Sequence, residues 1–264
     1  KKKKLIFTII KRIILFLINF VMVNSKLVIL KKKKIKVTQF RKVGSLKVSN
    51  FKRKKKINSL YKKNYDICLI PDSAINYNKL YKQSGIEEGF ALIVKFTIRF
   101  CKENNKKVII PMKRYKKNSE LEEIDFFKKY LNKGELDFLL KNSVTKNFKD
   151  KYTSYLKIYE SNVTLSSATS MLREALSLKK KVMVCTSSPI NIFDFPLNNL
   201  IFLKNPSYNK FEKRLHKILA ISERKYFNLL GKKSNYLIED SNKIDANDEV
   251  NSFIDKNLEN VKSF

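Results

Sequence analysis

The chain has 264 residues, of which 43% are hydrophobic and 31% are charged. This content is sufficient for a folded core, so it excludes an intrinsically disordered protein and leaves room for one large or two modest domains. The 57 Lys and Arg residues outnumber the 24 Asp and Glu residues, and the formal net charge is +33. We therefore expect the protein to attract anionic ligands and anionic membrane surfaces.

The distribution of the charge argues against a nucleic-acid partner. Lysines occur along almost every segment, and no segment has the basic helix or the mixed aromatic and basic motif of a known nucleic-acid module. Drift of genome composition explains a chain rich in Lys, Asn and Ile equally well. Nucleic acid is therefore not the partner that we expect.

The N-terminal segment, residues 1–51, is basic and apolar. It starts with four lysines and no Met, so we expect a fragment or a trimmed chain. Lys11 and Arg12 split the apolar residues 5–30, and the longest clean run, 13–23, is shorter than the ~20 residues of a membrane-spanning helix. We interpret residues 5–30 as a buried helix or strand pair. The alternative is an interfacial anchor with lysines reaching out on both sides, and we expect no secretory signal.

The next segments indicate a linker and then an α/β domain. Residues 52–64 are charged and lack a core pattern, which is typical of a linker, and Tyr65 begins a buried strand that Pro71 ends. Strands and amphipathic helices then alternate to residue 240, which predicts a doubly wound parallel sheet of the Rossmann type. Residues 241–264 are a polar tail, which either closes over the domain or is partly mobile. The expected strands cover residues 65–71, 108–112, 136–140, 163–165, 182–184 and 199–203, and the expected helices cover 90–104, 121–131, 152–159, 171–178, 208–220 and 223–230.

Isolated cysteines and a single histidine limit the chemistry. Cys68, Cys101 and Cys185 each lie in an apolar run, so we interpret them as buried thiols in a reducing compartment. His216 lies on the polar side of a predicted helix and is expected at the surface. A zinc site and a Ser-His-Asp triad both need residues that this chain lacks, and no metal or other cofactor is predicted.

Ligands of an open parallel sheet bind beyond the carboxyl ends of its strands. Three such ends carry polar residues: Asp72 and Ser73, Lys113 and Arg114, and the turn Ser166-Ser167-Ala168-Thr169-Ser170. The small turn residues leave helix N-terminal N–H groups open to a phosphate, and the basic pair has the chemistry to clamp a diphosphate. The alternative is structural, because Ser and Thr cap helices and Glu174 complements the helix dipole in any protein.

The turn, with Glu174-Ala175-Leu176 in the helix that follows, resembles the donor-site motif of GT-B glycosyltransferases and of related epimerases and polyol-phosphate transferases. The run from Val43 to Val48 resembles the segment that closes the N-terminal domain of many GT-B enzymes, and Gly44 there is expected at a strand end with positive φ. The segments from Asn191 to Tyr226 resemble the end of bacterial surface-carbohydrate biosynthesis proteins. The similarity covers roughly residues 65–240.

The resemblance implies a cytoplasmic glycosyltransferase of cell-surface polysaccharide biosynthesis, peripheral on the inner face of the plasma membrane if it contacts lipid. Its partners would be a nucleotide-sugar donor and a glycan or lipid-linked acceptor. Lys113, Arg114, Ser166, Ser167, Thr169, Ser170 and Glu174 would hold the donor, with Asp72 and Ser73 as weaker candidates. Glu174 would bind the ribose hydroxyls.

Other functions remain open at this stage. A polyol-phosphate transferase or a sugar-nucleotide epimerase would share the motif, and a basic protein without catalysis is a third class. The segment 5–51 contains no Asp, Glu or His that could serve as a general base, and about 50 residues are too few for an acceptor domain. We therefore expect donor binding without turnover from the isolated chain, and the catalytic base is not identified.

Overall fold

The computed structural model describes residues 44–55, 62–72, 85–112, 119–145, 152–167, 169–187, 200–231 and 245–262. The chain divides into two compact units. The larger unit is Ile57–Gly231, and the smaller one combines Lys1–Lys56 with Lys232–Phe264. The apolar residues 5–30 and their predicted membrane or core role lie outside the described residues.

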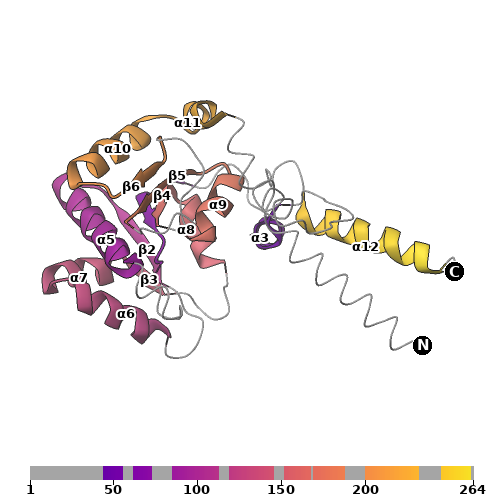
Figure 1. Ribbon diagram of the computed structural model, residues 1–264, viewed down its shortest axis with the longest axis horizontal. Coiled ribbons are helices and arrows are strands. Elements are labelled where there is room, and N and C mark those ends of the chain that lie inside the picture. Colours follow the sequence, from indigo (N-terminus) through magenta and orange to yellow (C-terminus); the bar gives the residue numbers. More distant parts are fainter. Residues whose placement is uncertain are drawn as a thin grey trace. The chain divides into compact units, whose positions relative to one another are not determined.

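A parallel sheet forms the centre of the larger unit. Within the described residues it has six strands in the order β3-β2-β1-β4-β5-β6, and all the pairings are parallel (Figure 1). The strands are β1 (Tyr65–Leu69), β2 (Val108–Met112), β3 (Ser143–Thr145), β4 (Ser161–Ser166), β5 (Lys181–Thr186) and β6 (Phe202–Lys204). The predicted α/β, doubly wound, Rossmann-like sheet is confirmed, because this order is the one typical of that fold.

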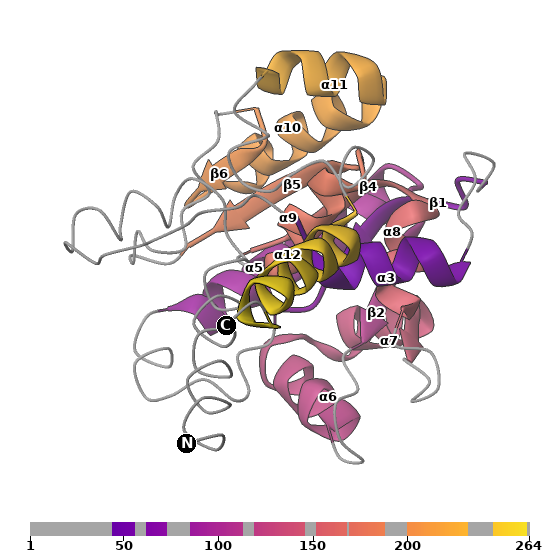
Figure 2. The same ribbon diagram turned by 90° about the vertical axis from the view of Figure 1, so that its right-hand side faces the viewer.

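Helices cover both faces of the sheet. Figure 1 shows α5 and α10 on one side and α8 and α9 on the other, and Figure 2 shows β6, β5 and β4 in succession. These helices pack directly against the central strands. The helices of this unit are α5 (Ile86–Glu103), α6 (Ser119–Tyr130), α7 (Lys133–Lys141), α8 (Thr153–Tyr159), α9 (Ser170–Ser177), α10 (Tyr208–Ala220) and α11 (Glu223–Leu230).

Apolar residues at helical spacing explain why these helices pack on the sheet. In α10 the side chains of Phe211, Leu215 and Ile218 are fully buried, and they recur every three to four residues along one face. The strands are buried on both faces, as expected for a parallel sheet that is covered twice; every residue of β5, for example, is buried. The core therefore lies on both sides of the central strands.

Two polar side chains fix the ends of α10 and α11 against β5. The buried Lys181 Nζ donates to the carbonyl oxygens of Ile218 and Ile221, at 2.7 Å each, and thereby caps the C-terminus of α10. The Tyr226 hydroxyl donates to Val182 O at 2.7 Å and accepts from Val182 N at 3.1 Å. Because β6 pairs with β5 only from Val184 onward, this hydroxyl replaces a strand partner at Val182.

The smaller unit contains a helix pair in its described part. Helix α3 (Leu46–Lys55) contacts α12 (Ala246–Lys262), and Ala246 and Val250 form a small core with Leu46. Arg53 bonds to Asp245, Nε to Oδ2 at 3.0 Å, and to Asp248, Nη2 to Oδ1 at 2.5 Å.

The structure corrects two expectations about elements and shows a helix in the polar tail. Residues 136–140 are not a strand but part of α7, which Asn132 and Glu135 start with a reciprocal capping box. Much of the polar tail is the helix α12, whose apolar residues are spaced four apart. The run after Gly44 is the helix α3, which also includes Lys52–Lys55 of the predicted linker, although the positive φ of Gly44, 74°, agrees with its predicted conformation.

Candidate ligand-binding site

The strand order places the candidate site between β1 and β4. Connections leave these two neighbouring strands in opposite directions along the sheet, so a crevice is expected beyond their carboxyl ends. Asp72 follows β1, and the hydroxyl turn follows β4. The structure therefore brings together two of the three predicted polar ends, although Asp72 and Ser167 are 95 residues apart in the sequence.

Hydrogen bonds fasten the ends of these two strands to each other. Ile70 N donates to Leu165 O at 2.9 Å, and Ser166 Oγ donates to Ile70 O at 2.7 Å. Ser167 Oγ donates to Asp72 Oδ2 at 2.6 Å. Ser166 is fully buried, and Ser167 and Asp72 keep only 3% and 6% of their surface exposed.

These bonds determine what the two serines can offer to a ligand. A hydroxyl has a single hydrogen, and in this arrangement Ser166 and Ser167 both donate it within the chain. Towards a ligand, each of these serine oxygens can only accept a hydrogen bond, and the same holds for the Asp72 carboxylate. The side chains at the centre of the edge are therefore acceptors, and donors to a phosphate have to come from the flanks.

The N-terminus of α9 supplies such donors. Thr169 is its N-cap residue, and the Thr169 Oγ1 atom accepts from Met171 N at 3.4 Å, which leaves the hydroxyl hydrogen available. Ser170, the first residue of the helix, is exposed. The first N–H groups of a helix have no partner within it, and the dipole adds positive potential there. Thr169 and Ser170 thus present the turn's accessible donors.

Glu174 lies on α9 and has a partner on the neighbouring helix. Its Oε2 accepts a hydrogen bond from the Tyr155 hydroxyl of α8 at 2.7 Å. Glu174 is half-buried and Tyr155 is buried, so the bond orients the carboxylate. A carboxylate has about four acceptor positions, so it can accept hydrogen bonds from more than one donor. Tyr155 was not among the predicted site residues, because no sequence pattern links α8 to α9.

Helix α5 reaches the same edge of the sheet from the other face. A Cβ atom added at Gly89 would lie 2.8 Å from the Cβ of Ser187, the residue that follows β5. Only a glycine permits this close approach of the first turn of α5 to the end of β5. Gly89 and Ser187 were not predicted as site residues. The close approach between them joins segments that are about a hundred residues apart in the sequence.

Three of the predicted site residues lie outside the described residues: Ser73, Lys113 and Arg114. Lys113 directly follows the last residue of β2, which is the neighbour of β1. Their roles remain predictions.

The cysteines and the histidine are where the sequence predicts them. Cys68, Cys101 and Cys185 are buried free thiols, and burial raises the pKa of Cys101 to about 12. His216 is exposed on α10, and its ring packs edge-on against Phe100 with 4.9 Å between the centroids. In the described part of the chain no group of three or more His, Cys, Asp or Glu residues could hold a metal ion.

The fold is similar to that of sucrose-phosphate synthase from Thermosynechococcus elongatus, with a TM-score of 0.46 and 11% sequence identity. The match covers 92% of this chain, and the chain spans 58% of the length of that structure. No protein-family model and no curated protein sequence matches the chain. No helix among the residues that the structure describes is long and apolar enough to cross a membrane.

Proposed function

We propose that the larger unit binds a nucleotide-sugar donor beyond the carboxyl ends of β1 and β4, and that the protein is a glycosyltransferase of cell-surface polysaccharide biosynthesis. One observation carries the proposal: the hydroxyl turn and the N-terminus of α9 lie at the point where the strand order reverses. The donor-motif resemblance of the segment from Ser166 to Leu176 gives the ligand class.

The chemistry would be displacement at the anomeric carbon of the sugar. The bond from this carbon to the diphosphate oxygen breaks, a bond to an acceptor hydroxyl oxygen forms, and the hydroxyl proton passes to a general base. The N–H groups at the start of α9 would stabilise the departing diphosphate, because it carries the negative charge that develops in the transition state. Glu174, oriented by Tyr155, would bind the ribose hydroxyls of the nucleotide.

The proposal predicts that the protein binds uridine, guanosine or cytidine diphosphate, measured by calorimetric titration and by thermal unfolding. The substitution Ser170→Glu locates the site. A carboxylate at this exposed position complements the α9 dipole and should leave the unfolding temperature equal or slightly higher. It repels a diphosphate, so we expect the dissociation constant to rise about tenfold or more.

A matched control makes the same change of charge elsewhere. Gly134→Glu adds a carboxylate in the first turn of α7, where the backbone is exposed and a Cβ has room. Its nucleotide affinity should stay within about twofold of the unsubstituted protein, because salt screens an exposed charge that makes no contact with the ligand. Binding of none of the three diphosphates, or equal binding by Ser170→Glu, would refute the proposal. Product analysis with nucleotide sugars separates a transferase from an epimerase or a polyol-phosphate transferase.

A further inference from the structure

Arg214 on α10 contains a buried N–H group without an acceptor. The side chain is half-buried, and its Nη1 atom is buried with no hydrogen-bond partner in the part of the chain that the structure describes. A guanidinium can only donate hydrogen bonds. An unsatisfied donor in the interior lowers the stability of the folded state, and more so when the donor is charged. Such a cost in a folded protein calls for an explanation.

The surroundings of Arg214 place it near the ligand edge of the sheet. Its guanidinium lies within electrostatic range of Cys185, the buried thiol near the end of β5. Val184 pairs with Ser166, so Cys185 is level with Ser167 at the candidate site. Burial lowers the pKa of Arg214, which reflects the same unfavourable desolvation.

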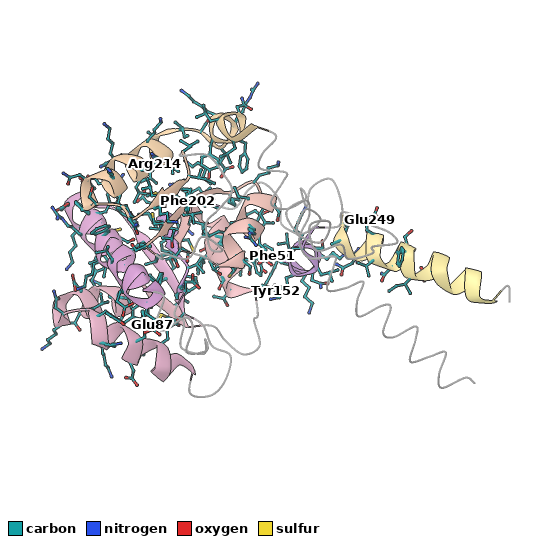
Figure 3. All side chains as sticks on the ribbon, in the orientation of Figure 1. Phe51, Glu87, Tyr152, Phe202, Arg214 and Glu249 are labelled. Carbon is teal, nitrogen blue, oxygen red and sulfur yellow. The ribbon has the colours of Figure 1, made fainter. Side chains whose placement is uncertain are left out.

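The direction of α10 points the side chain toward that edge. Lys181, at the start of β5, caps the C-terminus of α10, so the N-terminus of the helix faces the carboxyl ends of the strands. Side chains of a helix lean toward its N-terminus. Figure 3 shows Arg214 on α10 and Phe202 on β6, the strand from which this helix continues. A side chain that follows this rule would extend from α10 toward the carboxyl ends of the strands, the edge at which ligands of such sheets bind.

Arg214 and the start of α9 flank the edge from opposite faces of the sheet. Helix α10 packs beside α5 on one face, and α9 packs on the other. The edge between them carries the acceptors Asp72 and Ser167, which do not suit a phosphate. An anionic group that lies across the end of β5 would meet N–H donors on both of its sides. The planar fork of a guanidinium matches the geometry of phosphoryl oxygens.

We propose that Arg214 binds a phosphoryl oxygen of the ligand, as a specific anion contact on the face of the sheet opposite α9. The inference rests on the proposed function and adds a residue to it that lies outside the donor motif. In the absence of ligand the unsatisfied N–H destabilises the fold slightly. The ligand supplies the missing acceptor.

The test compares stability and binding in the same variants, with inorganic pyrophosphate and uridine diphosphate as probes. Arg214→Met keeps much of the apolar side chain and removes the charge and every donor. Because replacing a buried charge by an apolar residue of similar size is often neutral or stabilising, its unfolding temperature without ligand should equal or exceed that of the unsubstituted protein. Its dissociation constant for both probes should rise about 10- to 100-fold.

Two further variants make the result specific. Arg214→Lys keeps the charge without the fork and should bind the probes about three- to tenfold more weakly. Lys213→Met removes one positive charge from the exposed neighbouring position and should change the dissociation constants less than about twofold.

The outcomes separate this inference from the proposed function. If the unsubstituted protein binds neither probe nor any nucleoside diphosphate, both fail. If it binds them and Arg214→Met binds equally well, the inference fails and the proposed function stands. A lower unfolding temperature with unchanged affinity, in either Arg214→Met or Arg214→Lys, would show that the residue is structural.

Discussion

The hydroxyl groups between the end of β4 and the start of α9 have two different roles. Ser166 and Ser167 donate within the chain and fasten β1 to β4, whereas Thr169 and Ser170 lie at the open end of α9. The same residue type therefore serves structure in the first half of the turn and is available to a ligand in the second half. Ser167→Ala removes the hydrogen bond to Asp72, so we expect it to change the position of the Asp72 side chain. We expect no loss of a direct contact between residue 167 and a phosphate.

The substitution Glu174→Gln tests the role of the Glu174 carboxylate in nucleotide binding. Glu174→Gln removes the charge but keeps an oxygen that can accept from the Tyr155 hydroxyl, so the fold should stay intact. If the carboxylate holds ribose hydroxyls, nucleotide binding should weaken by ~1 to 3 kcal/mol, which is the range of a charge-assisted hydrogen bond. Calorimetric titration with uridine diphosphate measures the change.

Tyr155→Phe is the companion variant for Glu174. It leaves the carboxylate in place and removes the hydrogen bond from the Tyr155 hydroxyl that orients it, so the loss of affinity should be smaller than that of Glu174→Gln. Unchanged nucleotide affinity in Glu174→Gln, with a lower unfolding temperature, would make Glu174 a structural link between α8 and α9.

At the scale of elements, Tyr226 joins α11 to β5. Tyr226→Phe would leave both Val182 N and Val182 O, which are buried, without this partner. We expect the free energy of unfolding to fall by about 1 to 3 kcal/mol, measured by urea denaturation. The control is Tyr130→Phe, whose hydroxyl bonds are 3.3 Å or longer and lie near the surface. A loss no larger than that of the control would contradict the role of Tyr226.

The contact between α3 and α12 should depend on pH. Burial raises the pKa of Asp245, but Arg53 and the N–H groups of Asn247 and Asp248 lower it more, so the net pKa lies below the ordinary value. A carboxyl group with a lowered pKa stabilises the fold above its unfolded pKa, about 3.9, and loses this contribution as the pH falls through the folded value. We therefore expect helix content, followed by circular dichroism, to decrease below about pH 4.

Asp245→Asn tests this dependence. Asn still accepts the N–H groups at the start of α12 but does not titrate, so the variant should lose less helix on acidification. Asp255→Asn, at an exposed position on the same helix, is the matched control and should behave like the unsubstituted protein. An identical acid transition in Asp245→Asn would exclude this carboxylate as the titrating group.

Helices and strands with a clear apolar pattern were predicted more accurately from the sequence than short or irregular ones. Residues 108–112, 208–220 and 223–230 were predicted with the bounds that the structure shows, because each has a strong apolar period or a Ser cap. Residues 136–140 were misassigned, since a short apolar run suits a strand as well as a helix. The Ser turn was predicted, but the bond from Ser167 to Asp72 was not, because no local pattern encodes a contact over 95 residues.

The protein carries many more basic residues than its own acidic residues can pair with. The chain has 57 basic and 24 acidic residues, so even complete pairing would leave 33 cations for solvent or for a partner. A nucleotide sugar and an anionic acceptor surface would both be attracted by this field. The affinity of the protein for any diphosphate should accordingly decrease as the salt concentration rises. The control variants should show the same decrease.

The neighbouring position of β1 and β4 also sets an order of events during synthesis. Ser166 and Ile70 are 96 residues apart, and in the described part of the chain β2, β3 and the helices α5, α6, α7 and α8 lie between them in the sequence. Contacts over such separations form late, because the entropy of closing the intervening chain must first be offset. During synthesis on a ribosome, β1 would therefore be made well before β4. Until β4 follows, β1 could pair with β2 on one side only. The candidate binding edge would form only after β4 has been synthesised and has paired with β1.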